Sequence, residues 1–465
     1  MNKFLQSIAI LFSKRIKTSP KLRLDTNQEY TNAILPISGS LPTWLKGSLV
    51  RNCTMPVYEA GKESSHFFDG VAMLHAFQIE EGKVSYSSRY LESEAFAKII
   101  QSDTEFYQRK LTLENTKNIQ DAAVNVFKYN NSHVALTETP RPVRFDIDTL
   151  ETLGNFEFQD ELPKSDIFES AHPHYFEDSK EVFNFLTQYG RQTHYVVYKM
   201  VENSSRREVI ARIPVGEPGY IHSFAMTENY VILVEYPFVV NLLRLMSAKV
   251  DSFASYIRLF KWLPKQGTRF LVVDKHTGNL VEIKSEALFS FHHANAYEEN
   301  GEIVLDLIAN NFAKLGQIFP QAQGSADTTQ GLLRFRLSLQ EKKLSHENAL
   351  GTPTEFPRIS DGLNGKPYRY LYLVNLETPH HSLLKYDWEQ RKAISWEAEN
   401  TSVIEPVFVP SPHSRSEDDG VLLTVAHDHA ANLSYLLVLD AQNLHEIART
   451  ALPSPFPKSF HGQFF

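Results

Sequence analysis

The chain ends in Ser459-Phe460-His461-Gly462-Gln463-Phe464-Phe465, a histidine placed among aromatic residues. Chain termini are usually polar and poorly ordered, because few contacts hold them in place. An aromatic ending makes sense if the terminus is the closing strand of a core and His461 points at something inside it. We therefore expect this stretch to be built into the centre of the fold.

Three further stretches place a histidine among apolar residues beside a strand-like run. They are Ala171-His172-Pro173-His174, Ile221-His222-Ser223-Phe224-Ala225 and Phe291-His292-His293-Ala294-Asn295-Ala296-Tyr297-Glu298. The chain has 18 histidines, and one with apolar neighbours is more often a satisfied core residue than a metal ligand. The gaps between these stretches match no local metal motif, so only the fold can bring them together. Imidazole suits iron, zinc, copper and nickel alike.

The four stretches resemble the histidine motifs of the carotenoid cleavage oxygenase family, which includes carotene-cleaving enzymes, stilbene-cleaving enzymes and the retinal pigment epithelium isomerohydrolase. The resemblance runs from about Leu41 to Phe465. It rests, in chain order, on KGSLVRN (46–52), HFFDGVAMLHAF (66–77), FHHANAYE (291–298), GKPYRYLY (365–372) and SFHG (459–462). It implies an all-β fold, a seven-bladed β-propeller with a helical or loop cap over a central Fe(II). The implied iron ligands are His172, His222, His292 and His461.

Three glutamates stand in apolar, strand-like surroundings where an unpaired charge would be costly: Glu138, Glu355 and Glu405. A histidine that binds a metal normally donates its other ring N–H to a carboxylate or carbonyl, which fixes the aim of the ring. By the resemblance these glutamates would orient, in that order, His222, His292 and His461. The fourth histidine would lack a carboxylate partner. Without the resemblance, a glutamate at a strand end needs no functional explanation.

Composition narrows the class of protein. The chain has 465 residues, of which 42% are hydrophobic and 12% aromatic, and a net charge of −8. The charge gives no electrostatic footprint for nucleic acid. Cys53 is the single cysteine, which rules out an internal disulfide and suits a reducing, cytoplasmic location. No run approaches the roughly 18–20 apolar residues that would span a bilayer.

We expect residues 1–38 to form an arm or an amphipathic surface helix, and residues 39–465 to form one propeller domain that carries the catalytic site. The arm begins like a signal peptide, with Met1-Asn2-Lys3 and then the apolar run Phe4 to Phe12. That run is short, basic residues follow it, and no small-residue cleavage site appears. A helix of this kind could touch anionic lipid, and a disordered arm is the alternative.

The middle of the chain has the pattern of many short strands. Runs such as Val84 to Tyr90 and Thr268 to Val273 are alternating or rich in β-branched residues, and turn residues separate them. A weak repeat places an Asp after an apolar residue, with Thr or Asn three residues later, at 145–150, 273–278 and 439–444. Asp, Asn and Gly are the residues that tight turns need. Repeated hairpins without long helices between them favour a propeller of four-stranded blades.

Two segments, at about 95–118 and 239–263, break the β pattern and are expected to form the cap. The first is charged and helical in character. The second has apolar residues near helical spacing with basic residues on the rim, including Arg244, Lys249, Arg258 and Lys261. It is either a helix packed on the propeller or a surface through which a peripheral enzyme docks on a membrane.

Four neutral ligands leave a divalent ion its full charge, and octahedral geometry would keep two positions open for dioxygen and substrate, unlike a closed structural zinc site. The resemblance implies oxidative cleavage of a carotenoid or apocarotenoid double bond to two carbonyl products of the retinal type. This reaction needs no catalytic residue beyond the iron centre. Two alternatives are a retinoid isomerohydrolase on the same site and a carotenoid-binding protein without turnover. The oxygenase and the isomerohydrolase differ in their need for dioxygen.

Residues on family pocket positions discriminate among the reactions. They are Thr137, Phe356, Phe460 and, on a weaker alignment, Tyr58. Thr137 stands where stilbene-cleaving relatives have a lysine that engages the phenol of the substrate, which makes stilbene cleavage the less favoured reaction. Cys53-Thr54-Met55 replaces the glycine-proline-glycine turn of relatives. The stretch from Thr104 to Asp121 lacks the cysteine of the isomerohydrolase membrane loop, which favours cleavage over isomerohydrolysis.

One other histidine cluster has a spacing that could bind a metal. His427-Asp428-His429 lies between two strand-like runs, Val421 to Val425 and Ser434 to Leu439. We expect a solvent-exposed turn at this position rather than a metal site.

Overall fold

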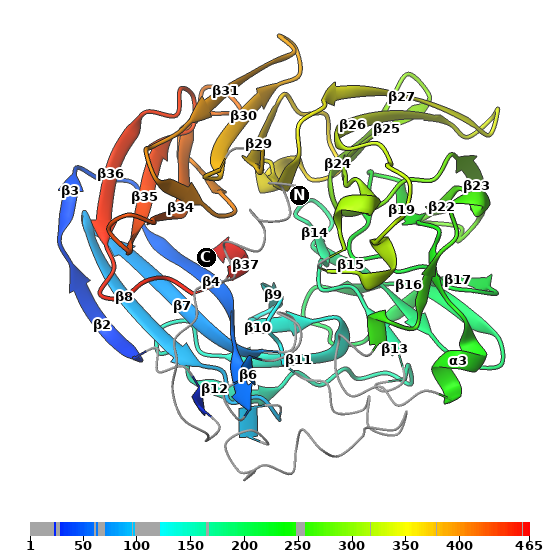
Figure 1. Ribbon diagram of the computed structural model, residues 1–465, viewed down its shortest axis with the longest axis horizontal. Helices are drawn as coiled ribbons and strands as arrows, with labels where there is room; N and C mark the ends of the chain where they lie inside the picture. The colour runs from blue at the N-terminus through cyan, green and yellow to red at the C-terminus, as the bar shows by residue number, and fades with distance from the viewer. Residues whose placement is uncertain are drawn as a thin grey trace.

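Antiparallel sheets arranged around a central axis are the repeating unit of this computed structural model (Figure 1). The structure describes residues 23–24, 28–59, 62–63, 70–94, 96–97, 121–163, 167–247, 256–316, 318–377, 379–457 and 459–465. Within these ranges, seven sheets have four or more strands and form the blades. The predicted seven-bladed β-propeller is therefore confirmed.

The first four blades, each written in spatial order, are β2 (Tyr30–Leu35), β8 (Lys83–Tyr90), β7 (Val71–Glu80), β4 (Gly47–Met55) and β37 (Ser459–Phe464); β12 (Thr152–Asn155), β11 (Thr139–Phe145), β10 (Ser132–Thr137) and β9 (Asn125–Tyr129); β13 (Ile167–Glu169), β15 (Glu181–Gln188), β16 (Thr193–Val201) and β17 (Glu208–Val215), with β14 (His174–Phe176) on β15; and β18 (Ala225–Met226), β19 (Tyr230–Glu235), β22 (Thr268–Asp274) and β23 (Leu280–Ser285).

The other three are β24 (Ser290–Glu299), β25 (Glu302–Ala309), β26 (Gly331–Ser338) and β27 (Lys343–Leu350); β28 (Thr354–Arg358), β29 (Tyr370–Asn375), β30 (Ser382–Asp387) and β31 (Lys392–Trp396); and β3 (Ile37–Gly39), β36 (Glu446–Ala451), β35 (Leu433–Asp440), β34 (Gly420–Asp428) and β32 (Thr401–Val403), with β33 (Val407–Pro410) on β34. Smaller elements are the sheet β1 (Arg23–Leu24), β5 (Val57–Glu59) and β6 (Lys62–Glu63), and the short helices η3 (Pro264–Gln266), η4 (Phe312–Lys314), η5 (Pro320–Ala322) and η6 (Asp361–Leu363).

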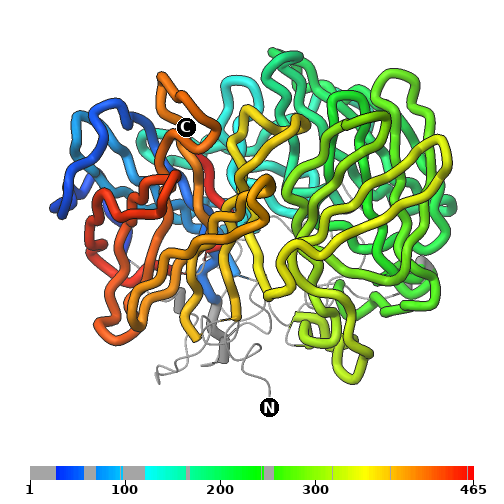
Figure 2. Tube along the Cα trace, turned by 90° about the horizontal axis from the view of Figure 1, so that it is seen from above, coloured from blue at the N-terminus to red at the C-terminus, as the bar shows by residue number. Residues whose placement is uncertain are grey.

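The ring of blades closes where distant parts of the chain meet. β37 pairs antiparallel with β4, so the 459–465 stretch is the closing strand of a blade whose other strands come from residues 30–90. Figure 2 shows the red end of the chain beside the blue early strands. In the neighbouring blade, β3 adds to the outer strand β36. The blades thus take in residues before the boundary expected at 38/39.

The hairpin repeat found in the sequence corresponds to a turn that recurs between strands. Asp146 Oδ1 accepts the backbone N–H groups of Asp148 and Thr149, at 3.1 and 2.8 Å, between β11 and β12. Asp274 makes the same pair of bonds between β22 and β23, and Asp440 does so between β35 and β36. The side chain replaces a backbone partner, which is why Asp is needed at the first position of the turn.

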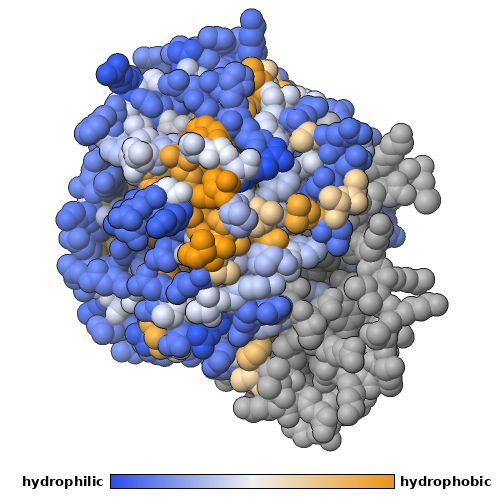
Figure 3. Space-filling view, turned by 90° about the vertical axis from the view of Figure 1, so that its left-hand side faces the viewer, coloured by the Kyte–Doolittle hydropathy of each residue, from blue (hydrophilic) through white to orange (hydrophobic). Residues whose placement is uncertain are grey.

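The hydrophobic core lies between neighbouring blades. The middle strands are buried on both faces, as in β7 and β25, because each blade is covered by the next one. The apolar interior is therefore distributed around the ring, and the axis is left for polar side chains. Figure 3 shows the outer face of the blades that carry β2 and β3, which is polar around a central apolar area. Ile34 of β2 is 71% exposed.

The segment at 239–263 differs from the expected amphipathic helical cap. Its ends are paired strands, β20 (Phe238–Val240) and β21 (Phe260–Trp262), and α3 (Leu242–Ser247) is its helical part among the residues described. Valine and aromatic residues favour strands over helices, and Pro237 and Pro264 flank the segment. Of the 95–118 segment, residues other than 96–97 lie outside the described ranges. No helix in the described part of the chain is long and apolar enough to cross a membrane.

Candidate metal centre

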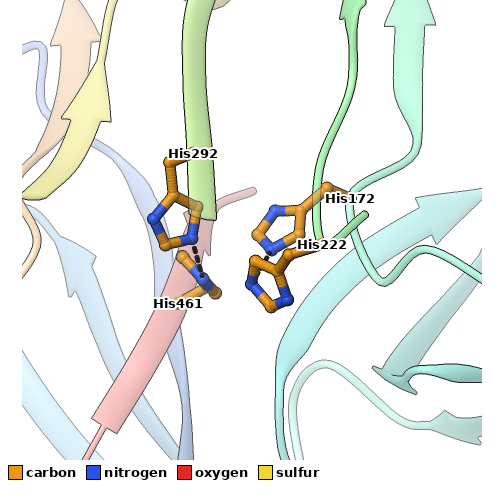
Figure 4. Close-up of side chains that lie close together, drawn as sticks. All are labelled: His172, His222, His292 and His461. Carbon is orange, nitrogen blue, oxygen red and sulfur yellow. Dashed lines mark hydrogen bonds between the residues drawn. The ribbon is translucent and has the colours of Figure 1, made fainter. Parts of the chain in front are cut away.

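The structure brings the four predicted histidines together on the propeller axis (Figure 4). Each lies at or beside the inner end of a different blade: His172 precedes β14, His222 precedes β18, His292 is in β24 and His461 is in β37. One ring nitrogen from each lies within 4.8 Å of all the others. Three of the histidines are buried and His172 is half-buried. No local motif could show this convergence, because the ring of blades creates it.

The spacing of the ring nitrogens suits a shared cation. The Nε2 atoms of His172 and His222 lie 3.0 Å apart, and those of His292 and His461 lie 3.2 Å apart. A metal about 2.1 Å from each nitrogen places neighbouring ligands at right angles roughly 3.0 Å apart. Four imidazoles at this spacing could therefore surround one ion.

Three carboxylates fix the other side of the rings. Glu138 Oε1 lies 2.6 Å from His222 Nδ1, Glu355 Oε2 lies 2.6 Å from His292 Nδ1, and Glu405 Oε1 lies 2.8 Å from His461 Nδ1. Each Nδ1 therefore carries the proton and donates it, which leaves a lone pair on Nε2. Lone pairs that face one another repel unless a cation lies between them, so the donor set fits a metal.

The pairing of glutamates with histidines is the one that the resemblance implied. Among the described residues, no carboxylate contacts His172. The glutamate side chains are between 2% and 11% exposed, so each is nearly cut off from water. A buried carboxylate without hydrogen-bond donors would destabilise the fold, so these three pairs also contribute to stability.

Glu138 and Glu355 are held by neutral donors whose role no sequence pattern indicated. The Tyr220 hydroxyl donates to Glu138 Oε1 at 2.8 Å. The Asn310 amide donates to Glu355 Oε1 at 2.7 Å, and the Phe356 backbone N–H donates to Oε2 at 3.1 Å. Burial alone would raise the pKa of Glu355, but His292 and these donors hold it below its usual value.

Glu405 is held instead by two arginines. Arg51 Nη1 lies 3.1 Å from Oε2, and Arg358 Nη1 lies 3.7 Å from Oε1. The Gly462 N–H also donates to Oε2, at 2.9 Å. Burial acts to raise the pKa of Glu405, but His461, Arg358 and Arg51 lower it to about 2. Arg51 lies in the KGSLVRN motif, so its place in the sequence was marked but its role was not.

The neighbouring histidines His174 and His293 are held by partners outside the group of four. His174 places Nε2 3.0 Å from the carbonyl of Phe224, and His293 places Nδ1 2.9 Å from Ser223 Oγ. In the pairs His172/His174 and His292/His293, the first histidine is thus the one on the axis. His427 and His429 bond Ser434 and Ser402 at 2.9 and 2.8 Å. Within the described ranges, the four axial histidines form the one group of three or more that could hold a metal.

A cavity of about 610 Å³ reaches His172, His292 and His461. Its other walls combine polar side chains, including Asn125, Ser223 and Arg358, with apolar ones. Phe356 lines it, with its ring centroid 5.6 Å from those of both His292 and His461. Phe356 has a φ of +55°, a backbone conformation that is strained for a bulky residue and typical of functional sites.

The other predicted pocket residues lie elsewhere. Thr137 ends β10, is buried, and bonds the carboxyl group of Asp121, whose pKa burial raises to about 6. Phe460 is half-buried in β37. Neither lines this cavity. Tyr58 is in β5, and its side chain lies outside the described part of the structure.

Solved structures share this fold. The cobalt-substituted apocarotenoid oxygenase of Synechocystis is 22% identical, with a TM-score of 0.81 over 99% of this chain and 98% of that one. A chimera of that oxygenase with RPE65 gives the same figures.

Comparisons of sequence extend over most of the chain. The family model described as retinal pigment epithelial membrane protein matches residues 24–465. The β,β-carotene 15,15'-dioxygenase of Mus musculus is 29% identical, over 92% of this chain and 88% of that protein. The carotenoid isomerooxygenase of Galleria mellonella is 31% identical, over 92% of both. The chain therefore belongs to the carotenoid cleavage oxygenase family, the family of the retinal pigment epithelial membrane protein.

Proposed function

We propose that the protein is a non-haem Fe(II) dioxygenase that cleaves a double bond of a carotenoid or apocarotenoid and releases aldehyde or ketone products of the retinal type. The observation that carries this proposal is the group of four histidines backed by three carboxylates, in a chain of this family. Names of relatives support the substrate class, since they include a carotene dioxygenase and a carotenoid isomerooxygenase.

His172, His222, His292 and His461 would hold the iron, which would supply the one-electron chemistry that brings dioxygen into reaction with an alkene. Glu138, Glu355 and Glu405 would keep the ligand rings aimed. Cleavage of a C=C bond by one dioxygen gives two C=O groups and moves no proton. A protein acid or base is therefore unnecessary, and the side chains have only to bind, orient and exclude water.

The second candidate is a retinoid isomerohydrolase on the same iron site. The polar side chains in the wall of the cavity that reaches three of the histidines favour it, because a hydrolytic step needs water at the metal. Stilbene cleavage is less favoured, since Thr137 offers no cation to a phenol. A carotenoid-binding protein without turnover would have no use for four clustered histidines that can hold a metal.

Product analysis with and without dioxygen separates these reactions. Protein loaded with Fe(II) is given β-carotene, an apocarotenal or a retinyl ester in detergent, and the products are separated by chromatography. We expect aldehydes or ketones that form only with dioxygen, and their chain lengths name the cleaved bond. Retinol isomers formed from the ester without dioxygen would replace the proposal with the isomerohydrolase.

The matched controls for this assay are His292→Ala and His427→Ala. His292 belongs to the group of four histidines, whereas His427 bonds Ser434 and does not line the cavity. Product formation should disappear in the first variant and persist in the second. A wild-type protein that holds stoichiometric iron yet converts none of the three compounds, while retaining a coloured polyene, would support the binding protein instead.

We also propose that the enzyme lies in the cytoplasm and takes its substrate from a membrane surface. Buried Cys53 suits a reducing compartment, although one relative is a mitochondrial carotenoid-cleaving dioxygenase. Leu243 of α3 is 77% exposed beside exposed Arg244, the combination expected of a surface that inserts an apolar side chain among anionic headgroups.

Sedimentation with vesicles of phosphatidylcholine and phosphatidylserine tests the membrane contact. Because a fully buried leucine contributes about 1.5–3 kcal/mol, Leu243→Asp should lower binding about ten-fold or more. Leu433→Asp is the control, since Leu433 is 40% exposed in β35 and belongs to no proposed contact. Equal binding of the two variants would show that α3 does not contact the membrane. A wild-type protein that binds no vesicles would contradict the membrane contact altogether.

A further inference from the structure

Arg51 is a fully buried arginine that lies under the closing strand. The hydrogen bonds that its guanidinium makes to described residues go to β37 or to Glu405. Arg51 Nε donates to Ser459 Oγ at 3.3 Å, and Nη2 donates to the carbonyl of Phe460 at 3.0 Å. Nη1 donates to the backbone carbonyl of Glu405 at 3.0 Å and to its Oε2 at 3.1 Å. The guanidinium is 0% exposed, so water cannot replace any of these partners.

These bonds bracket His461 in a part of β37 that the sheet does not hold. Among the described strands, β37 lies at the edge of its sheet and pairs with β4 alone, and its register is interrupted between Ser459 and Gly462. Phe460 and His461 therefore have no regular partners in β4. Arg51 instead binds the two residues before His461, and Glu405, which Arg51 holds, binds the His461 ring and the next backbone N–H.

The chain leaves room for this arrangement. A Cβ on Gly462 would lie 2.5 Å from Arg51 Cδ and 2.7 Å from the carbonyl of Val50, so only glycine lets β37 pass this close to the arginine. The other two carboxylates have neutral supporting donors and orient histidines outside the closing strand. Among the three histidines that have a glutamate partner, His461 is thus the one whose glutamate is held by arginines.

We propose that Arg51 is a positioning residue that holds His461 in its ligand position before any metal arrives. The inference rests on the proposed metal site. With Arg51 in place, β37 is ordered with or without metal, and metal binding does not have to order the strand. Without the hydrogen bonds of the Arg51 guanidinium, β37 is docked in only a fraction of the molecules. Only that fraction can bind metal, so the apparent metal affinity falls in proportion to it.

Hydrogen exchange of the 459–465 peptide, with and without Co²⁺, tests the proposal in the full-length protein. In the wild type, protection of these amides should be nearly the same in both states. Arg51→Lys keeps the positive charge but cannot make the several hydrogen bonds of the guanidinium. In this variant the 459–465 peptide should exchange faster without metal, and Co²⁺ should restore its protection. The Co²⁺ dissociation constant should rise roughly ten-fold, by the same factor by which the docked fraction falls.

Arg334→Lys is the matched control. Arg334 is a nearly buried arginine that forms a two-point ion pair with Asp306, at 2.8 and 2.7 Å, in a blade that does not contain β37. It should lower thermal stability while leaving exchange of 459–465 and Co²⁺ affinity unchanged. If Arg51→Lys does not fold, Ser459→Ala removes one bond to Arg51 and should give a smaller change of the same kind.

The outcomes distinguish the inference from the proposed function. Wild-type protein that binds no Co²⁺ at the histidines would overturn the metal site itself. Wild-type protein that binds Co²⁺ but orders 459–465 only when it does so would overturn the role of Arg51. Equal changes of exchange and affinity in Arg51→Lys and Arg334→Lys would overturn that role as well.

Discussion

Deletion of residues 459–465 is expected to abolish metal binding and cooperative unfolding together, whereas His461→Ala is expected to weaken metal binding strongly and leave cooperative unfolding in place. The deletion removes β37, the strand that pairs with the inner edge of β4. It also removes the hydrogen bonds of buried Arg51 to Ser459 and Phe460, so that Glu405 is left as its partner. Each lost hydrogen bond to the charged guanidinium costs about 1.5–3 kcal/mol, so the two together take a large share of the roughly 5–15 kcal/mol that stabilises a domain. Loss of the strand pairing adds to that cost.

His461→Ala keeps the closing strand and its support. Glu405 retains Arg51, Arg358 and the Gly462 N–H, so no buried charge is left unpaired. Metal affinity should nevertheless fall by more than the ten- to hundred-fold typical of losing a partner of a ligand. Circular dichroism during heating and metal content by mass spectrometry measure the two effects. A deletion variant that melts like the wild type would show that β37 is dispensable for the fold.

Replacing the three glutamates by glutamine should weaken metal binding by about ten- to a hundred-fold each, and not equally. Glu138 accepts both the Tyr220 hydroxyl and His222 Nδ1 on one oxygen, so a glutamine carbonyl can take both and only the charge is lost. Glu355 accepts donors on both oxygens, so a glutamine N–H would face another N–H. Glu355→Gln should therefore cost more affinity than Glu138→Gln.

Glu405→Gln should also destabilise the metal-free protein, because Arg51 and Arg358 would lose their shared carboxylate. Competition with a chelator gives the affinities, and thermal unfolding without metal gives the stabilities. Glu235→Gln is the control, since Glu235 is a buried glutamate paired with Tyr195 and Arg269 away from the axis. Unchanged metal affinity in all three site variants would refute the assigned role of the carboxylates.

The sequence was informative where chemistry is local or where the family pattern is strong. The Asp-led turns at 146, 274 and 440 could be predicted, because each is made by residues two or three positions apart. The meeting of His172, His222, His292 and His461 followed from the resemblance, since their spacing alone left a core role equally open. The same holds for the pairing of each glutamate with its histidine.

What escaped prediction depends on contacts between distant residues. Arg51 meets Glu405 across 354 residues and Phe460 across 409, and nothing near Arg51 announces either partner. Periodicity misassigned the ends of 239–263, because Phe238–Val240 and Phe260–Trp262 stabilise each other as strands, which a helical pattern in one segment cannot reveal. The left-handed backbone at Phe356, beside His292 and His461, likewise has no marker in the neighbouring sequence.

The closure through β37 also has a consequence for synthesis. β4 emerges from the ribosome about four hundred residues ahead of its partner, a gap that takes roughly 20–80 s at about 5–20 residues per second. During that time its inner edge is an unpaired row of N–H and C=O groups, open to pairing with other nascent chains. The fourth histidine of the metal-binding group and the strand that covers this edge are then made together, within the same few residues. We expect a nascent chain to be most vulnerable to aggregation just before it becomes able to bind a metal ion.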